Sequence, residues 1–369
     1  MAPQCRPRGT LMRMSLVTAT FRLKIPTGSG PDAEGSQGYV AAPAPNPAPL
    51  AAHPMSSILP VRRLLIGQNA HVRLAALIRA ARPDLEIRGA PATEVTPADL
   101  DWADAYLGFR RPSHPAMGRV RWVQSTGAGV DPWFADPPLP LDVVLTRTPE
   151  SFGPMIAEWA LSRALAFVTR LPELATAQRE HRWAPPEIGT LRGTHAVVVG
   201  TGDVGTHVGR LFGAMGCRMS GVSRTGEGDR QVFSAMYGTH DLATVAATAD
   251  WLICTLPLTP ATTRVIDATV LSVCRGAVLL NAGRGAVVDE ALLPRALDAG
   301  WLRGAALDVF ETEPLPATSP LWDDPRVMIS PHVSGLTTLE GAAEGFLECL
   351  ATFERGETPR WVVDRERGY

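Results

Sequence analysis

Three glycines near the middle of the chain have the spacing of a phosphate-binding turn. Gly200, Gly202 and Gly205 follow the strand-like run H-A-V-V-V at 195–199 and precede apolar residues at helical spacing. In such a motif the first glycine permits a tight turn, the second lets a pyrophosphate approach the backbone, and the third lets the helix lie close to the strand. The N–H groups at the helix start then face the anion. We therefore predict a dinucleotide site, although the glycines alone are also compatible with a tight turn that binds no ligand.

The residues at the expected ribose-binding position indicate which dinucleotide is bound. About twenty residues beyond such a motif, an acidic side chain usually holds the adenosine ribose hydroxyls of NAD. This chain has Ser223 and Arg224 in that region. Because no carboxylate would repel a 2′-phosphate and a guanidinium is available to pair with it, the sequence favours NADP over NAD. The alternative is an arginine in an exposed turn.

Four further polar side chains lie at or just after the ends of expected strands: Arg284, Asp308, Glu313 and His332. Open parallel sheets collect their ligands beyond the C-terminal ends of the strands, so this common position predicts a functional site. Taken one at a time, each residue also has a structural explanation. These are a surface turn for the arginine, a helix cap for the aspartate, a solvated loop for the glutamate and a satisfied structural group for the histidine.

An earlier loop, S-T-G-A-G-V-D at 125–131, also follows an expected strand. Its small residues would expose successive backbone N–H groups to a carboxylate. A tight glycine turn without a ligand explains the same sequence equally well.

The composition argues against several function classes. The 369 residues are 45% hydrophobic and 20% charged, which is typical of a globular enzyme long enough for two domains. A net charge of −2 gives no signature for binding nucleic acid or an anionic membrane surface. No apolar run is long enough to predict a membrane span. The five scattered cysteines without a C-x-x-C pair predict neither disulfides nor a zinc site, so we expect no metal and a cytoplasmic protein.

The elements that must position these residues alternate between strands and helices, which predicts an α/β fold with parallel sheets. Residues 1–60 are rich in Pro, Gly, Ala and Ser and are predicted to be a disordered tail. The expected strands lie at 61–66, 85–87, 105–108, 120–124, 143–146, 195–199, 251–254, 277–280, 305–307 and 327–330. The expected helices lie at 70–81, 154–180 and 339–355, besides those that follow Gly205 and Asp289.

Two of these helices carry specific expectations. The segment 154–180 is expected to be one long helix or a bent pair with a break at Pro172. Its apolar residues lie on more than one side, so it is either deeply buried or used in subunit contact. Asp289 is expected to be the N-cap of its helix, which Gly300 closes.

Taken together and in order, four motifs resemble those of the D-isomer-specific 2-hydroxyacid dehydrogenases. They are G-T-G-D-V-G at 200–205, N-A-G-R-G at 281–285, A-L-D-V-F-E-T-E-P-L-P at 306–316 and S-P-H at 330–332. Within that family the chain is most similar to the glyoxylate/hydroxypyruvate reductase A subgroup. The stretches that carry this likeness are G-A-G-V-D at 127–131, V-S-R at 222–224, P-L-W at 320–322 and V-D-R-E-R-G-Y at 363–369.

The resemblance implies a fold and an assembly. A Rossmann-type doubly wound parallel sheet at 154–332 would be inserted into a smaller flavodoxin-like α/β substrate domain. That domain would comprise residues 61–153, completed by 333–369, so that the final helix packs back on the first segment. The resemblance also implies a homodimer formed through the nucleotide domain.

The resemblance further implies a catalytic triad of Arg284, Glu313 and His332. His332 would protonate the carbonyl oxygen, a role suited to a side chain whose ordinary pKa is about 6.5. Glu313 would hold the imidazole and favour its charged form. Arg284 would bind the substrate carboxylate and polarise the carbonyl, since its two-pronged donor geometry suits a carboxylate better than lysine does.

The remaining implied contacts are with the two ligands. Ala128 and Gly129 would give backbone N–H groups to the substrate carboxylate, and Asp308 would hold the nicotinamide carboxamide. The residues expected around the cofactor are Gly200, Gly202, Asp203, Val204, Gly205, Ser223, Arg224, Thr255, Leu256, Pro257, Ala282, Arg284 and Asp308.

The leading hypothesis is an NADPH-dependent reductase of small 2-oxo acids such as glyoxylate or hydroxypyruvate. An NAD-linked dehydrogenase, for instance of 3-phosphoglycerate, is the alternative that Ser223 argues against. Formate dehydrogenases of the family lack the glutamate, so Glu313 disfavours that activity. A cofactor-sensing binding protein, similar to the family's transcriptional corepressors, stays open because those proteins keep the triad.

Overall fold

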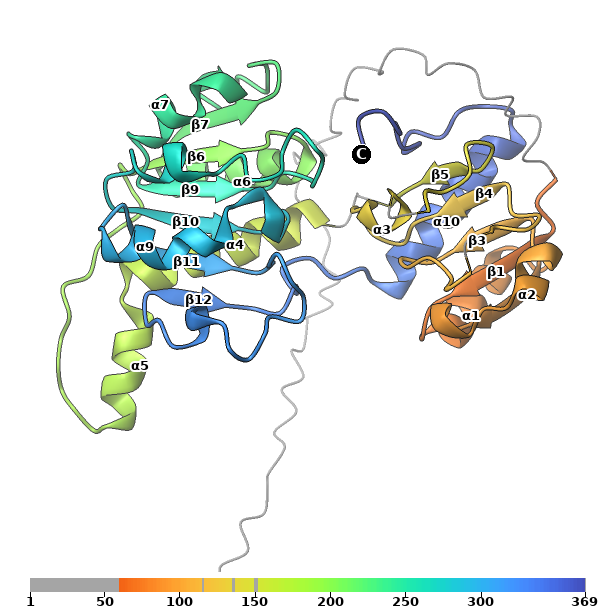
Figure 1. Ribbon diagram of the computed structural model, residues 1–369, viewed down its shortest axis with the longest axis horizontal. Coiled ribbons are helices and arrows are strands. Elements are labelled where there is room, and N and C mark those ends of the chain that lie inside the picture. Colours follow the sequence, from red (N-terminus) through yellow and green to blue (C-terminus); the bar gives the residue numbers. More distant parts are fainter. Residues whose placement is uncertain (1–59, 115, 135–136, 149–151, 369) are drawn as a thin grey trace, which may run out of the picture. The chain divides into compact units, whose positions relative to one another are not determined.

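The structure is a computed structural model that describes residues 60–114, 116–134, 137–148 and 152–368. The predicted disordered tail at 1–60 lies outside the described residues, apart from its last residue. The described chain contains two parallel sheets with helices around them (Figure 1). The predicted α/β class is therefore confirmed.

The smaller sheet has five parallel strands in the order β2-β1-β3-β4-β5. This is the strand order of flavodoxin-like doubly wound sheets. Its strands are β1 (Arg63–Gly67), β2 (Glu86–Ala90), β3 (Ala105–Leu107), β4 (Trp122–Gln124) and β5 (Val144–Thr146). The helices along this part of the chain are α1 (His71–Ala81), η2 (Ala92–Glu94), α2 (Pro97–Trp102) and α3 (Asp131–Phe134).

The final helix of the chain, α10 (Leu339–Glu354), packs against this sheet and α1. Trp122 of β4 stacks on Phe346 with ring centroids 4.9 Å apart and makes a T-shaped, edge-to-face contact with Phe353 at 5.0 Å. These aromatic pairs join segments that are far apart in sequence, and Figure 1 shows α10 behind the five strands. The final helix therefore returns to the first sheet, as expected.

The larger sheet has seven parallel strands in the order β12-β11-β10-β9-β6-β7-β8. The order reverses between β6 and β9, which is where doubly wound sheets place their ligands. The strands are β6 (His195–Val199), β7 (Arg218–Ser223), β8 (Ala235–Gly238), β9 (Trp251–Cys254), β10 (Ala277–Asn281), β11 (Leu302–Leu307) and β12 (Val327–Ile329).

The α-helices of this part of the chain are α4 (Phe152–Val168), α5 (Leu171–Arg179), α6 (Asp203–Ala214), α7 (Leu242–Ala246), α8 (Ala268–Leu271) and α9 (Leu293–Asp298). The short 3-10 helices are η3 (Thr239–Asp241), η4 (Gly285–Val287), η5 (Glu290–Leu292) and η6 (Pro320–Trp322).

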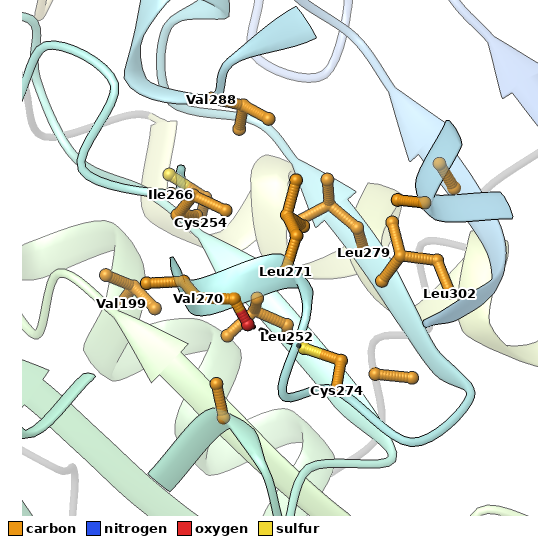
Figure 2. Packing of buried hydrophobic residues seen from close by; sticks show 14 of the residues in the cluster. Val199, Leu252, Cys254, Ile266, Val270, Leu271, Cys274, Leu279, Val288 and Leu302 are labelled. Carbon is orange, nitrogen blue, oxygen red and sulfur yellow. Dashed lines mark hydrogen bonds between the residues drawn. The ribbon is translucent and has the colours of Figure 1, made fainter. Parts of the chain in front are cut away.

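Both faces of the larger sheet are buried, because its strands alternate between two apolar clusters. In β6, Val197 and Val199 join the cluster covered by α7, α8 and α9, part of which Figure 2 shows. Ala196 and Val198 point the other way, into the cluster formed with α4 and α6. Burial on both faces is what a parallel sheet requires, and it fixes the loops at the strand ends.

The structure corrects three details of the sequence interpretation. The 154–180 segment is a bent pair, but the break is at Arg170, which is left-handed with φ 54°, and Pro172 lies in the first turn of α5. Proline is tolerated there because the first N–H groups of a helix have no intrahelical partner. Asp289 makes no side-chain cap, since the chain enters α9 through η5. Strands β7 and β8 were not predicted, and in β8 only one of the four residues is buried.

Candidate functional site

The glycine turn has the geometry that each of its three positions requires. Gly200 has φ 101°, which only glycine adopts readily, and a Cβ on Gly205 would overlap the carbonyl oxygen of Gly200. A Cβ on Gly202 would meet no atom within 4 Å, so the backbone there borders open space. The N–H groups of Gly202, Asp203 and Val204 have no acceptor among the described residues. A strand-to-helix turn with unpaired N–H groups fits a pyrophosphate.

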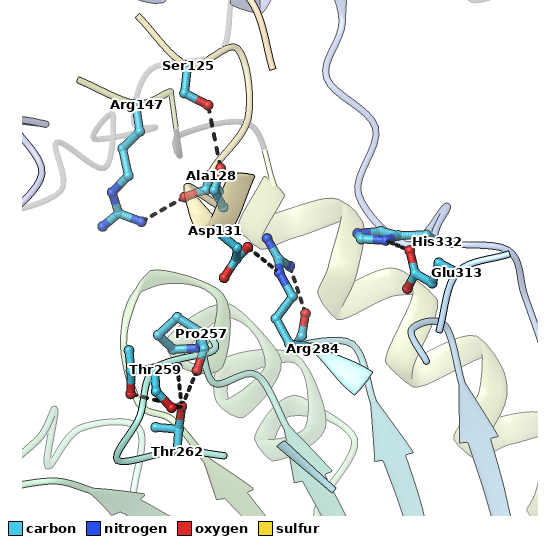
Figure 3. A network of polar contacts seen from close by, with 12 residues as sticks. Ser125, Ala128, Asp131, Arg147, Pro257, Thr259, Thr262, Arg284, Glu313 and His332 are labelled. Atoms are coloured by element: carbon cyan, nitrogen blue, oxygen red, sulfur yellow. Dashed lines mark hydrogen bonds and ion pairs between the residues drawn. The ribbon is translucent and has the colours of Figure 1, made fainter. Parts of the chain in front are cut away.

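The loops that follow β6, β9 and β10 contact one another. Thr255 donates its hydroxyl to the carbonyl oxygen of Gly200 at 2.7 Å, and Leu256 packs against the same glycine. A Cβ on Gly283 would contact the carbonyl oxygen of Leu256. Pro257 is held by the Thr262 hydroxyl, which donates to its carbonyl at 2.7 Å (Figure 3). Most of the loop residues predicted around the cofactor therefore lie along one edge of the sheet.

The two residues that follow β7 are oriented differently. Ser223 donates its hydroxyl to the carbonyl oxygen of Glu227 at 2.8 Å. Arg224 is exposed and has no hydrogen bond or ion pair with any residue that the structure describes. Its guanidinium is therefore available to an anion, and its contact with a 2′-phosphate stays a prediction.

Arg284 is held in a tight turn after β10. The buried Asn281 donates its amide N–H to the carbonyl oxygen of Arg284 and accepts the N–H of Gly283, each at 3.1 Å. The sequence interpretation assigned no role to Asn281. The Arg284 guanidinium donates from Nη1 to the Gly283 carbonyl at 2.8 Å and from Nε to Oδ2 of Asp131 at 2.7 Å (Figure 3).

The loop after β4 meets Arg284. A Cβ on Gly129 would overlap Nη2 of Arg284, so the guanidinium lies directly on this part of the backbone. The N–H groups of Ala128 and Gly129 have no acceptor among the described residues. Arg147 donates to the carbonyl oxygen of Ala128 at 3.2 Å. Unpaired N–H groups beside a guanidinium can bind a carboxylate.

His332 and Glu313 form a direct pair. Nδ1 of His332 lies 2.8 Å from Oε2 of Glu313, and the two side chains are 40% and 38% exposed. The other carboxylate oxygen of Glu313 accepts the N–H of Phe310 at 3.1 Å, which holds the carboxylate in place. Because Nδ1 is bound to the glutamate, Nε2 is the nitrogen that can exchange a proton with a ligand.

Asp308 is fully buried and organises the segment that carries His332. Its carboxylate accepts the hydroxyl of Ser330 at 2.6 Å and the N–H groups of Val333 and Ser334 at 3.0 and 2.8 Å. Its carbonyl oxygen accepts the N–H of His332 at 2.8 Å. These contacts were not foreseen, and the predicted contact between Asp308 and a cofactor stays a prediction.

The structure thus brings Arg284 to the Gly129 loop and pairs His332 with Glu313. Backbone packing connects these two groups. A Cβ on Gly285, next to Arg284, would overlap the backbone of Phe310, whose N–H is bound by Glu313. No hydrogen bond or ion pair joins Arg284 to His332 or Glu313 in the described part of the chain. That the three act on one substrate stays a prediction.

Two titratable groups near the site have displaced pKa values. Burial raises the pKa of the Glu290 carboxyl, and the nearby Glu311 and Glu313 carboxylates raise it further. Burial also raises the pKa of the Cys254 thiol, at the end of β9, to about 12. This thiol is therefore inert at neutral pH.

The described residues contain no cluster of three or more side chains suited to holding a metal ion. None of the described helices is both long enough and apolar enough to cross a bilayer.

Comparison with known proteins connects this geometry to one family. The model of the D-isomer specific 2-hydroxyacid dehydrogenase NAD-binding domain matches residues 161–334. Glyoxylate/hydroxypyruvate reductase A from Serratia proteamaculans is 32% identical, over 82% of this chain and 97% of its own length.

Two solved structures are similar over most of the chain. A D-isomer specific 2-hydroxyacid dehydrogenase from Xanthobacter autotrophicus Py2, in complex with NADPH and MES, is 32% identical with a TM-score of 0.76. The NADPH-dependent glyoxylate/hydroxypyruvate reductase from Sinorhizobium meliloti, in complex with NADP and sulfate, is 28% identical with a TM-score of 0.75. Each alignment covers 84% of this chain and 100% of the other.

Proposed function

The chain belongs to the D-isomer-specific 2-hydroxyacid dehydrogenase family of NAD(P)-dependent oxidoreductases, and we propose that it reduces small 2-oxo acids such as glyoxylate and hydroxypyruvate with NADPH. The observation that carries the proposal is the placement of Arg284 against the Gly129 backbone, beside two N–H groups without an acceptor in the described chain. Together with the His332–Glu313 pair, the chain offers a carboxylate site and a proton donor.

In the proposed mechanism the substrate carboxylate binds the guanidinium of Arg284 and the N–H groups of Ala128 and Gly129. His332 then gives a proton from Nε2 to the carbonyl oxygen, while Glu313 orients the ring through Nδ1. A bound NADPH supplies the hydride to the carbonyl carbon. The product is the 2-hydroxy acid. The glycine turn, Thr255 to Pro257, Ala282 and Asp308 would surround the cofactor.

The substrate range and the reaction itself are tested by one kinetic panel. Purified protein is mixed with NADPH or NADH and with glyoxylate, hydroxypyruvate, pyruvate or 3-phosphohydroxypyruvate, and oxidation of the cofactor is followed at 340 nm. We expect the highest kcat/KM with NADPH and one of the first two acids. A preference for NADH and the phosphorylated acid would favour the 3-phosphoglycerate dehydrogenase activity. Binding of NADPH without turnover of any acid would favour the corepressor-like binding protein.

The NADPH preference is proposed to depend on Arg224, the exposed guanidinium beside the end of β7. Arg224→Asp places a carboxylate where the 2′-phosphate would bind, so we expect the ratio of kcat/KM for NADPH to that for NADH to fall at least about tenfold. The matched control is Arg275→Asp, an exposed arginine before β10 at the opposite end of the sheet. If both variants keep the wild-type ratio, Arg224 does not contact the phosphate.

The domain division also remains part of the proposal. We assign substrate binding to residues 61–153 with 333–369 and cofactor binding to 154–332. The two separate strand orders and the return of α10 to the first sheet support this division. Closure about the connecting segments would exclude water from the reacting groups.

A further inference from the structure

The Arg284 guanidinium is only partly occupied by its protein contacts. Arginine has five N–H donors, and here Nε is bound to Asp131 and one N–H of Nη1 to the Gly283 carbonyl. The second N–H of Nη1 and both N–H groups of Nη2 have no acceptor among the described residues. The end of the fork is therefore available to a ligand while its Nε side is held by the protein.

Asp131 is the carboxylate that holds that side. It begins α3, directly after the loop that carries Gly129, and its side chain is 29% exposed against 23% for Arg284. Its Oδ2 lies 3.1 Å from the position that a Cβ on Gly129 would take, and the same position overlaps Nη2 of Arg284. The acid, the arginine and the backbone proposed to bind the substrate thus meet at Gly129. Figure 3 shows the contact between Asp131 and Arg284.

A second charged side chain at this loop is that of Arg147, which carries a positive charge. Arg147 reaches the loop from the carbonyl side of Ala128, with its guanidinium 5.9 Å from the centre of the Trp361 ring. Glu313 is paired with His332. Asp131 is therefore the negative charge that an incoming carboxylate meets at Arg284.

We propose that Asp131 is a positioning residue for Arg284 and the counter-ion with which the substrate carboxylate competes. The inference rests on the proposed function, because it takes Arg284 as the carboxylate-binding group. The hydrogen bond to Nε fixes the plane of the guanidinium, so that Nη2 lies on the Gly129 backbone. The charge of Asp131 at the same time weakens the attraction of the site for anions. Positioning of the guanidinium favours the reaction, whereas the negative charge of Asp131 weakens substrate binding. Two substitutions separate these effects.

In Asp131→Asn the amide oxygen still accepts the Nε–H, but the negative charge is lost. We expect the KM for glyoxylate and the dissociation constant of oxamate, a non-reducible monoanionic analogue, to fall about threefold to tenfold. In Asp131→Ala the hydrogen bond is lost as well. We expect its kcat to be at least about tenfold below that of Asp131→Asn, because a misplaced binding group costs rate at the reacting centre.

The control is Asp142→Asn, which removes an acid that is 67% exposed and paired with Arg121. It should leave both constants at the wild-type value, and thermal unfolding checks that all three variants fold. Oxamate binding to the protein saturated with NADPH is measured by calorimetry, which needs no turnover.

Equal kcat in Asp131→Asn and Asp131→Ala would overturn the positioning role, and unchanged oxamate binding in Asp131→Asn would overturn the counter-ion role. A wild-type protein that reduces no 2-oxo acid would instead refute the proposed function, and the oxamate comparison would still decide the counter-ion role.

Discussion

His332 combines a reactive side chain with an unusual backbone. Its φ of 54° is left-handed, a conformation that asparagine, aspartate and histidine tolerate better than other residues with a side chain. The conformation is held from both sides, by the Asp308 carbonyl on the His332 N–H and by the Asp308 carboxylate on the next two N–H groups. The proposed proton donor is therefore positioned by a buried acid that does not touch its ring.

This geometry selects the substitution that tests the proposed acid. His332→Asn removes the imidazole but keeps a residue that accepts positive φ, so we expect kcat to fall about 10²- to 10⁴-fold. The dissociation constant of NADPH, measured by fluorescence, should change less than about twofold. His332→Val, which cannot adopt this φ without strain, should in addition lower the unfolding temperature. A rate in His332→Asn above about a tenth of wild type would require a different proton donor.

At this scale the sequence identified the reactive groups better than the groups that hold them. Arg284, Glu313 and His332 follow strands in recognisable motifs, and the structure pairs His332 with Glu313. Asn281 and Asp131 lie inside motifs that were singled out, yet neither was given a role. Asn281 holds the turn of its own motif, a role that its residue type alone does not indicate. Asp131 acts on Arg284, which is 153 positions away in the chain. No local pattern reports such a pairing.

Among the elements, β6 and α6 show how glycine sets the distance between a strand and a helix. A Cβ on Gly205 would overlap the carbonyl oxygen of Gly200, whereas a Cβ on Gly213 of the same helix would lie 3.6 Å from its nearest neighbour, Cγ of Met219. Packing therefore requires glycine at position 205 but not at position 213, which makes Gly213 a control for Gly205.

We therefore expect Gly205→Ala to push α6 away from the turn and to weaken NADPH binding at least about tenfold. Gly213→Ala should bind NADPH as wild type does and should be as stable or more stable, by up to about 1 kcal/mol, because alanine favours the helix. NADPH titration and thermal unfolding check both variants. Wild-type affinity in Gly205→Ala would mean that the turn does not form the pyrophosphate site.

Some elements with a strong buried pattern could be predicted, whereas those fixed by tertiary context could not. The run Trp251–Cys254 was recognised with its bounds because all four residues are buried. The edge strand β8 has three half-buried residues and gives no such signal. The kink between α4 and α5 depends on the left-handed conformation of Arg170. Arginine is not a residue type from which that conformation is predicted.

At the scale of the whole molecule, the resemblance implies a dimer through the nucleotide domain, and the segment 154–180 was expected to be either deeply buried or used in subunit contact. The apolar residues of α4 are largely buried within the chain against β6, β9 and α6. Exposed apolar side chains instead follow on α5 and the segment after it. They are Leu171 at 55%, Leu174 at 38%, Trp183 at 99% and Ile188 at 62% exposure.

This segment borders a cavity of about 600 Å³, whose lining combines apolar residues such as Phe167 and Met328 with charged ones such as Arg303 and Arg326. In a two-fold dimer this exposed arm, residues 171–188, of each copy would cover the apolar part of the cavity of the other. We therefore propose a second copy of this chain as the partner of this surface. The test is the mass of the protein in solution.

Trp183→Glu places a charge at the most exposed of these apolar positions, where burial in a dimer would leave it unpaired. We expect sedimentation velocity at micromolar concentration to give a dimer for the wild type and a monomer for this variant. Leu141→Glu is the matched control, because Leu141 is 76% exposed but lies outside the arm. It should sediment as the wild type does. A wild-type monomer, or a Trp183→Glu dimer of unchanged affinity, would show that this surface is not the dimer contact.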